Sequence, residues 1–453
     1  MQDAPDSVAT PTTSSWPLVG RLLAAYRPEP AIPRITEPVA LSRELRRWRW
    51  RIFLSSFFGY FVLYFARKNI SASLPIIAND LGYLNVEVGF IGTMLYVTYG
   101  AGKLLNGILA DRANIRVFMA TGLIASGVVN LAFGSVSSLW LMAFFWGLNG
   151  WFQSMGFPPI ARALTIWLPR DRFKTTRWAF WTCSHQLGTA VIMPVTGALL
   201  AYGSWRLCFW LPGAIVTLCG IVLLFSMADT PASKGLPTAR HFEEQIENKG
   251  EDFLGTLIRA VLLNRNVWVI GLIDMGVYAV RFGTLDWMTK FLMDEKGFDV
   301  QSASQRAGLM PAAGVVGVLV LGFIADRLFK GYYRVINTVC LAGLAACMTG
   351  LLTTGHTSPW LDLLLLAGIG FFVEGPQSIL GGIGAIDASA SERVAASAVG
   401  LVGILSYFGA SLSGIGTGYL LDHYSWEGAF CLWIAMSLLG FVLCAVAWKE
   451  RRT

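Results

Sequence analysis

Two arginines lie inside long hydrophobic stretches, where an unpaired charge is costly. Arg67 and Arg281 are 214 positions apart. Tyr60 and Tyr64 precede the first arginine on the same helical face, and Tyr278 lies three positions before the second. Neither arginine has a carboxylate four positions away, although an arginine within a membrane normally faces a polar cavity or a charged partner. The sequence therefore predicts that both guanidiniums face a ligand.

A small anion is the ligand that suits two arginines. The planar guanidinium binds phosphate or carboxylate through two parallel hydrogen bonds. Phosphate carries a charge of about −1.5 to −2 near neutral pH and balances two guanidiniums, whereas a monocarboxylate would leave one of them uncompensated. These residues alone predict a binding site for a small, phosphorylated anion.

Further polar residues lie within the hydrophobic stretches, namely Lys68, Lys103, His185 and Glu374. For Lys68 we favour a structural role, in which the side chain extends toward the headgroups or bonds neighbouring carbonyls. His185 taken alone favours a hydrogen-bonded packing role, and for Lys103 packing and ligand binding are equally supported. Asp286 and Lys290 are four positions apart and are expected to neutralise each other.

The elements that must position these residues follow from the composition. Of 453 residues 55% are hydrophobic, and only 14% are charged, against roughly 25% in soluble domains. This composition excludes a disordered chain, a fibrous repeat and a secreted disulfide scaffold. It predicts an all-α membrane protein with twelve transmembrane helices, for which the sequence offers hydrophobic stretches at 52–78, 86–110, 117–134, 138–167, 178–202, 207–227, 267–292, 303–325, 335–354, 358–386, 394–421 and 427–448.

Basic residues in the loops indicate the orientation of these helices. The even-numbered connections carry ten lysines and arginines, and the odd-numbered ones carry three. Because cytoplasmic loops are enriched in positive charge, we expect the even loops and both termini in the cytoplasm. The net charge of +7 follows from these loops and does not indicate nucleic-acid binding.

Four regions follow from this pattern. Residues 1–50 are expected to form a mobile basic tail, because no sustained apolar stretch occurs there and five arginines lie between positions 43 and 51. Residues 51–227 form a first six-helix bundle, 228–266 a polar cytoplasmic connector, and 267–453 a second six-helix bundle.

The two bundles carry related motifs. A Gly-x-x-x-Asp-Arg loop ends with Asp111 and Arg112 in the first half and with Asp326 and Arg327 in the second, 215 positions later. We expect these charges at the cytoplasmic helix ends to serve packing and gating. Together with the spacing of the two arginines, the repeat predicts two pseudo-symmetric halves, as secondary transporters commonly have.

A set of motifs resembles one family of the major facilitator superfamily, the organophosphate:phosphate antiporters. The motifs lie at 64–69, 99–103, 149–159, 181–185, 281–287 and 375–377. The resemblance implies that Arg67 and Arg281 bind phosphate and that Lys103 and His185 form a second cationic shell. It further implies a cavity lining of Tyr60, Tyr64, Tyr278 and Tyr407. At position 374 this chain has a glutamate where the glycerol phosphate carriers have an aromatic residue. Three roles for Glu374 stay open: an ion pair with Lys103 or Arg281, contact with a sugar hydroxyl, and coupling to a proton.

The resemblance implies the major facilitator fold and the exchange of an organophosphate for inorganic phosphate. The organophosphate is expected to be a sugar phosphate, glycerol phosphate or phosphoglycerate. We expect a functional monomer in the inner (cytoplasmic) membrane. A membrane sensor for a sugar phosphate on the same fold is the alternative. The seven cysteines lie in or beside apolar stretches without CxxC spacing, so neither a zinc site nor a disulfide framework is expected. No enzymatic activity or cofactor is expected either, because the sequence shows no metal cluster, no Cys-x5-Arg motif and no nucleophile placed beside a base.

Overall fold

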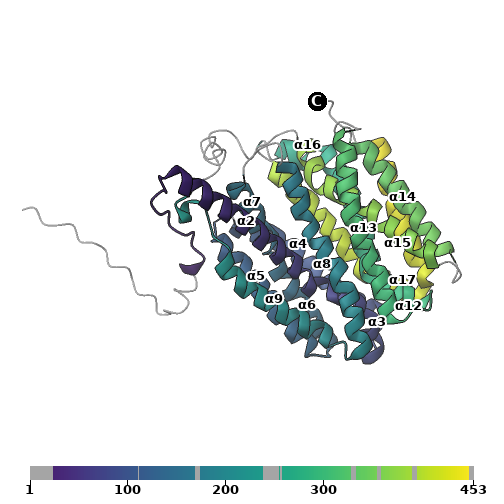
Figure 1. Cartoon of the computed structure of the whole chain (residues 1–453). Helices are drawn as coiled ribbons and strands as arrows, with labels where there is room; N and C mark the ends of the chain where they lie inside the picture. Colours follow the sequence, from purple (N-terminus) through teal and green to yellow (C-terminus); the bar gives the residue numbers. More distant parts are fainter. Residues whose placement is uncertain are drawn as a thin grey trace, which may run out of the picture.

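Helices account for all regular structure in the described part of the chain. The computed structural model describes residues 24–110, 112–168, 174–237, 255, 258–327, 333–354, 359–389 and 395–447. The first half of the sequence (purple to teal) and the second half (green to yellow) form two bundles that lie side by side (Figure 1).

Six membrane-spanning segments make up the first half. In chain order these are α2 (Pro38–Leu63) continued by α3 (Phe65–Leu81), α4 (Asn85–Ala110), α5 (Ile115–Gly134), α6 (Leu139–Gln153) continued by α7 (Phe157–Trp167), α8 (Lys174–Tyr202) and α9 (Leu207–Ser226). The break between α6 and α7 precedes Pro158 and Pro159, which lack the N–H that helical hydrogen bonds require.

The second half repeats this arrangement. Its segments are α12 (Arg265–Asp294), α13 (Val300–Arg327), α14 (Tyr333–Thr353), α15 (Pro359–Ile379) with its continuations η3 (Leu380–Gly384) and α16 (Ala385–Ser389), and α17 (Ala395–Val442). Two segments lie within α17, because Ser425 adopts a φ of 64° and bends the chain there. The twelve predicted segments are thus confirmed. By length and hydropathy alone, seven helices in the described part qualify as membrane spans, and Ser397–Ala447 is the last of them.

Reciprocal helix contacts join the halves. The second segment of the first half, α4, packs against the fifth segment of the second half, which is the first part of α17. In the same way, the fifth segment of the first half, α8, packs against the second segment of the second half, α13. A side chain on Gly89 would clash with the backbone of Gly414, so both glycines are needed where α4 and α17 approach. Asp422 of α17 accepts hydrogen bonds from the backbone N–H groups of Asn85 and Val86, at 3.1 and 2.8 Å.

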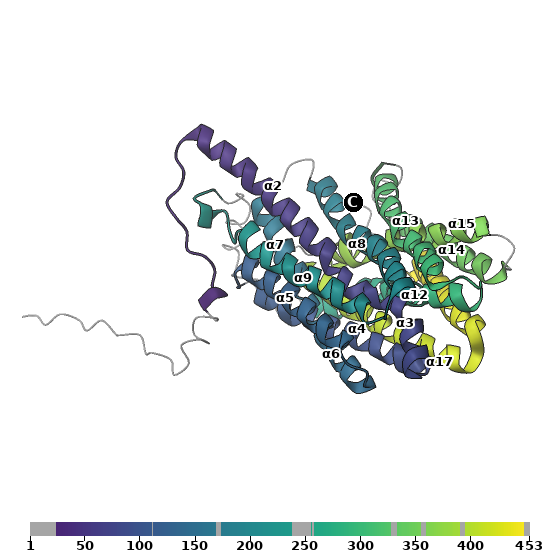
Figure 2. The same cartoon turned by 60° about the horizontal axis from the view of Figure 1, so that its bottom comes forward.

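The first membrane helix begins earlier than the expected boundary at residue 51. Since α2 starts at Pro38, residues 38–50 continue the helix beyond the bundle (Figure 2). Residues 24–37, which were expected to be mobile, contact the folded chain instead: the hydroxyl of Tyr26 lies 2.6 Å from that of Thr121, and the N–H of Ile32 donates to the carbonyl of Ala232 at 3.1 Å. Residues 1–23 lie outside the described part.

The start of the connector packs against the first half through Asp229. This buried carboxylate accepts a hydrogen bond from the N–H of Ile115, the first residue of α5, and another from the N–H of Glu29, both at 2.9 Å. The side chain of Glu29 in turn forms an ion pair with Arg116 at 2.6 Å. One carboxylate therefore holds the N-terminal segment, the connector and the start of α5 together, and its charge also suits the N-terminal end of a helix.

The predicted gating residues are described only in part. Asp111 and the side chain of Asp326 lie outside the described residues. Arg112 is exposed, and the Arg327 guanidinium lies 5.3 Å from the centre of the Phe323 ring. The proposed gating role stays a prediction.

Replacing Asp229 with alanine should destabilise the protein measurably. The change leaves two backbone N–H groups without their acceptor, at a cost of about 1–3 kcal/mol each when such groups are buried. Thermal unfolding in detergent checks this, with Asp299→Ala as control, because exposed Asp299 accepts comparable bonds from Gln301 and Ser302 at the start of α13. Equal losses in the two variants would contradict a special role for Asp229.

Candidate functional site

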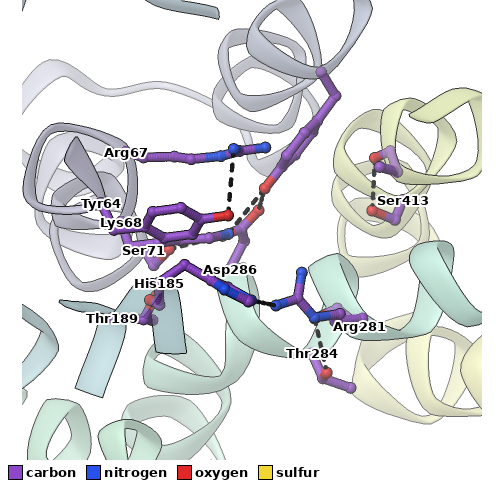
Figure 3. A network of polar contacts seen from close by, with 12 residues as sticks. Tyr64, Arg67, Lys68, Ser71, His185, Thr189, Arg281, Thr284, Asp286 and Ser413 are labelled. Carbon is purple, nitrogen blue, oxygen red and sulfur yellow. Dashed lines mark hydrogen bonds and ion pairs between the residues drawn. The ribbon is translucent and has the colours of Figure 1, made fainter. Parts of the chain in front are cut away.

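A layer of buried charged and aromatic side chains lies between the two halves. Helices α2, α3, α4 and α8 contribute from the first half, and α12, α15 and α17 contribute from the second. Figure 3 shows Arg67 and Lys68 on one side of this layer, with Asp286 and Arg281 reaching toward them from the other half. The structure thus brings the two predicted arginines to one central region.

Aromatic groups surround the guanidinium of Arg67. Its carbon lies 4.3 Å from the ring centre of Tyr99 and 5.2 Å from that of Tyr64, within the range of cation–π attraction. Hydroxyl oxygens of Tyr64 and Tyr407 each lie 3.5 Å from a terminal nitrogen. The side chain is only 2% exposed, its Nε has no hydrogen-bond partner, and no carboxylate forms an ion pair with it within the described residues.

Arg281 is paired, in contrast. Its Nε donates to Oε1 of Glu374 at 2.7 Å, and the two side chains are 6% and 5% exposed. A terminal nitrogen lies 3.4 Å from Nε2 of His185, which belongs to the other half. Because a guanidinium can only donate, this nitrogen of His185 accepts in that contact. Of the roles left open for Glu374, pairing with Arg281 is the contact that the structure contains.

Lys68 forms the ion pair that links the halves. Its Nζ lies 2.6 Å from Oδ1 of Asp286, which also accepts a hydrogen bond from Ser71 at 2.7 Å. The hydroxyl of Tyr96 donates to the second oxygen of the same carboxylate. The expectation that Asp286 neutralises Lys290 is therefore wrong. Lys290 points toward the helix end, where it pairs with Asp294 at 2.8 Å.

Lys103 and Tyr407 meet at the interface of α4 and α17. The Lys103 ammonium lies 5.5 Å from the ring centre of Tyr407, and no carboxylate forms an ion pair with it within the described residues. The ring of Tyr407 also contacts those of Tyr99 and Tyr278, with centres 4.7 and 5.4 Å apart. The hydroxyl of Tyr278 accepts a hydrogen bond from Gln377 at 3.2 Å.

Three further predicted residues, Tyr60, Tyr64 and His185, form a cluster of ring contacts beside this layer. The Tyr60 ring stacks on Trp181 with centres 5.1 Å apart, and it contacts the Tyr64 ring at 5.5 Å. The imidazole of His185 packs against the same two tyrosines, at 6.2 and 5.2 Å. All nine predicted binding residues thus lie in one continuous network.

Several groups in this network were missing from the sequence prediction. Tyr96, Tyr99 and Phe282 contact the cations, but aromatic residues in an apolar helix also suit an ordinary core. Asp274 is 1% exposed and hydrogen-bonds Ser406, while its Oδ1 has no partner within the described residues. Its position seven residues before Arg281, on the same helical face, was the available signal.

The electrostatic balance of the layer favours an anion. Among the described residues, four cations lie here with the three carboxylates of Asp274, Asp286 and Glu374, and two of the cations, Lys68 and Arg281, have a carboxylate within ion-pair distance. The other two, Arg67 and Lys103, have aromatic neighbours instead. A small cavity adjoins Arg67 and Asp286. Such a site can bind a negatively charged ligand through bidentate hydrogen bonds.

Known proteins are similar to this chain in sequence and in fold. The family model described as Major Facilitator Superfamily matches residues 56–380. A Chlamydia muridarum (strain MoPn / Nigg) protein named probable hexose phosphate transport protein is 34% identical over 441 residues, covering 94% of this chain and 96% of that protein. The membrane sensor protein UhpC of Escherichia coli (strain K12) is 35% identical over 406 residues, covering 88% and 92%. A solved bacterial homologue of the human lysosomal transporter Spinster has a TM-score of 0.71 at 16% identity, over 90% of this chain and 99% of that one.

Two matching halves around a buried charged layer define a multi-pass membrane protein with the major facilitator fold. The chain belongs to the Major Facilitator Superfamily and, within it, to the family of organophosphate:phosphate antiporters.

The ion pair between Lys68 and Asp286 yields a prediction on stability. Removing one partner leaves a buried charge without compensation, which costs about 3–5 kcal/mol, whereas removing both is often nearly neutral. We expect Lys68→Met and Asp286→Asn each to lower the thermal unfolding midpoint in detergent, and the double variant to recover much of the loss. Lys290→Gln is the control, since its partner lies near the surface and such pairs contribute about 0–1 kcal/mol. A double variant as unstable as the sum of the single ones would refute the pairing.

Proposed function

We propose that the protein is a secondary transporter that exchanges an organophosphate for inorganic phosphate by alternating access. The observation that carries this proposal is the buried guanidinium of Arg67, which has aromatic neighbours and no ion-pairing carboxylate within the described residues. Arg281 reaches the same layer from the other half. Phosphate carries about −1.5 to −2 charges near neutral pH, so it can compensate Arg67 and compete with Glu374 for Arg281.

The charge of the site explains why exchange is favoured. Drawing the halves together around the Arg67 guanidinium, which has no ion-pairing carboxylate within the described residues, is costly, because buried charges lose their hydration. A phosphate group that bridges Arg67 and Arg281 removes this cost, so the loaded carrier changes faces faster than the unloaded one. Outward movement of phosphate then drives uptake of the organic ester.

Names of relatives support the substrate class. A hexose phosphate transport protein at 34% identity and near-complete coverage suggests a sugar phosphate as the organic substrate. The basic residues of the even-numbered loops support cytoplasmic termini. The proposal also places the protein in the inner membrane as a functional monomer. The proposal includes no enzymatic step, cofactor or nucleic-acid partner.

A membrane sensor of a sugar phosphate is the second candidate, favoured by the 35% identity to the membrane sensor protein UhpC. A sensor keeps the binding site but has no need to release its ligand on the opposite side. Exchange of labelled phosphate in proteoliposomes separates the two candidates. Proteoliposomes loaded with labelled phosphate are diluted into sugar phosphates, glycerol phosphate or phosphoglycerate, and release of the label supports the transporter. Binding without release supports the sensor.

Arg67→Lys and Arg281→Lys should each abolish phosphate exchange. Lysine keeps the charge but lacks the planar fork that binds phosphate through two hydrogen bonds. Arg206→Lys is a matched control, because Arg206 bonds the carbonyls of Gly134 and Val136 at a helix end, away from the central layer. Expression and thermal stability of all three variants are measured alongside exchange. Exchange near the parent rate in either central variant would show that the arginine pair is misassigned.

His185 yields a pH-dependent prediction. Imidazole is the side chain that changes its charge between about pH 5 and 8, and its protonated form attracts phosphate. In the unloaded site Nε2 of His185 accepts from Arg281, whereas a bound phosphate favours the protonated imidazole. Binding then takes up a proton, which is easier at low pH, so His185→Ala should weaken organophosphate affinity more at pH 6 than at pH 8. Competition with labelled phosphate at both pH values measures the affinity. Equal losses would assign His185 to packing alone.

A further inference from the structure

Glu374 and Arg281 form an ion pair within the second half, between helices α15 and α12. The carboxylate oxygen Oε1 lies 2.7 Å from Nε of the guanidinium, and both side chains are buried. The other carboxylate oxygen has no hydrogen-bond partner within the described residues. Glu374 therefore contacts the guanidinium to which the proposed function assigns a phosphate.

A carboxylate and a phosphate compete for the same donors. Each accepts bonds from the guanidinium edge, and each compensates its charge. When phosphate binds Arg281, Glu374 must share or lose the Nε donor. When phosphate leaves, Glu374 can return and neutralise the guanidinium without help from the substrate.

We propose that Glu374 is an internal counter-anion that replaces the substrate on Arg281, and that the protein therefore catalyses net transport of phosphate compounds in addition to exchange. The inference rests on the proposed function, since it concerns the same site. Without Glu374, the unloaded carrier would have to bury Arg281 uncompensated. With Glu374, the penalty that holds back the unloaded carrier is reduced.

The surroundings of Arg67 contribute to the same effect. The Tyr99 ring lies 4.3 Å from this guanidinium, and the face of an aromatic ring partly compensates a cation. In the absence of substrate, one guanidinium thus has a carboxylate and the other has aromatic rings. Both halves of the site contain groups that lower the cost of returning unloaded.

The experiment compares net efflux with exchange in the same proteoliposomes. Vesicles loaded with labelled inorganic phosphate are diluted into buffer without phosphate, which measures net efflux, or with phosphate, which measures exchange. Potassium on both sides together with valinomycin prevents a membrane potential from opposing net efflux. We expect the parent protein to release label into phosphate-free buffer well above vesicles that contain Arg67→Lys.

Glu374→Gln is the decisive variant, because glutamine keeps the size and loses the charge. We expect the ratio of net efflux to exchange to fall by about tenfold or more, since the guanidinium is then buried without a counter-charge. Glu374→Asp keeps the charge and should retain a ratio closer to that of the parent. Asp362→Asn is the matched control, because Asp362 lies on the same helix and forms a buried ion pair with Lys296 at 3.2 Å, outside the central layer. Its ratio should stay at the parent value.

Three outcomes would overturn the inference. Exchange by the parent without net efflux refutes it while leaving the proposed function intact, and this measurement requires no variant to fold. An unchanged ratio in Glu374→Gln refutes it as well, and a changed ranking of organophosphates at that unchanged ratio would assign Glu374 to recognition of the organic part. Absence of exchange in the parent refutes the proposed function itself.

Discussion

The cost of burying charge in a medium of low dielectric constant governs this structure. An ion taken out of water loses several kcal/mol of solvation even after the protein relaxes around it, and Lys68, Arg67 and Arg281 are each at most 5% exposed. Each cation therefore needs compensation from a neighbouring helix. Two ion pairs provide such compensation. Lys68 and Asp286 join α3 to α12, and Arg281 and Glu374 join α12 to α15.

The cations differ in how firmly they are compensated. Asp286 accepts hydrogen bonds from Lys68, Ser71 and Tyr96, so both oxygens of this carboxylate have partners from the first half. Arg67 has ring faces and distant hydroxyls, which attract a cation but leave its Nε without a partner in the part of the chain that the structure describes. The molecule thus combines a well-compensated ion pair between the halves with a guanidinium that has capacity for another partner. This contrast separates groups that hold the fold from groups that bind a ligand.

Hydropathy and local spacing predicted the twelve segments and the faces on which the arginines lie, because these properties depend on residues that are near each other in the sequence. The repeated motifs predicted the two pseudo-symmetric halves. Partners across helices could not be found in this way, because Lys68 and Asp286 are 218 positions apart and Arg281 and Glu374 are 93 apart. Helical spacing indicates which way a residue points, but not which side chain of another helix lies opposite. Asp286 was accordingly assigned to Lys290, four positions along the same helix, when its partner lies in the other half.

The contact between Asp422 and the start of α4 has a different physical character from the buried ion pairs. A helix begins with backbone N–H groups that have no partner within the helix, and here a carboxylate from the opposite half accepts two of them. Asp422 is thus a helix cap in trans, and such caps contribute about 1 kcal/mol. Because these N–H groups lie at the very start of α4, water can replace Asp422 as their acceptor if the two halves separate. In the proposed alternating-access cycle, this contact is therefore one that water can replace, and its loss leaves no buried polar group without a partner at the start of α4.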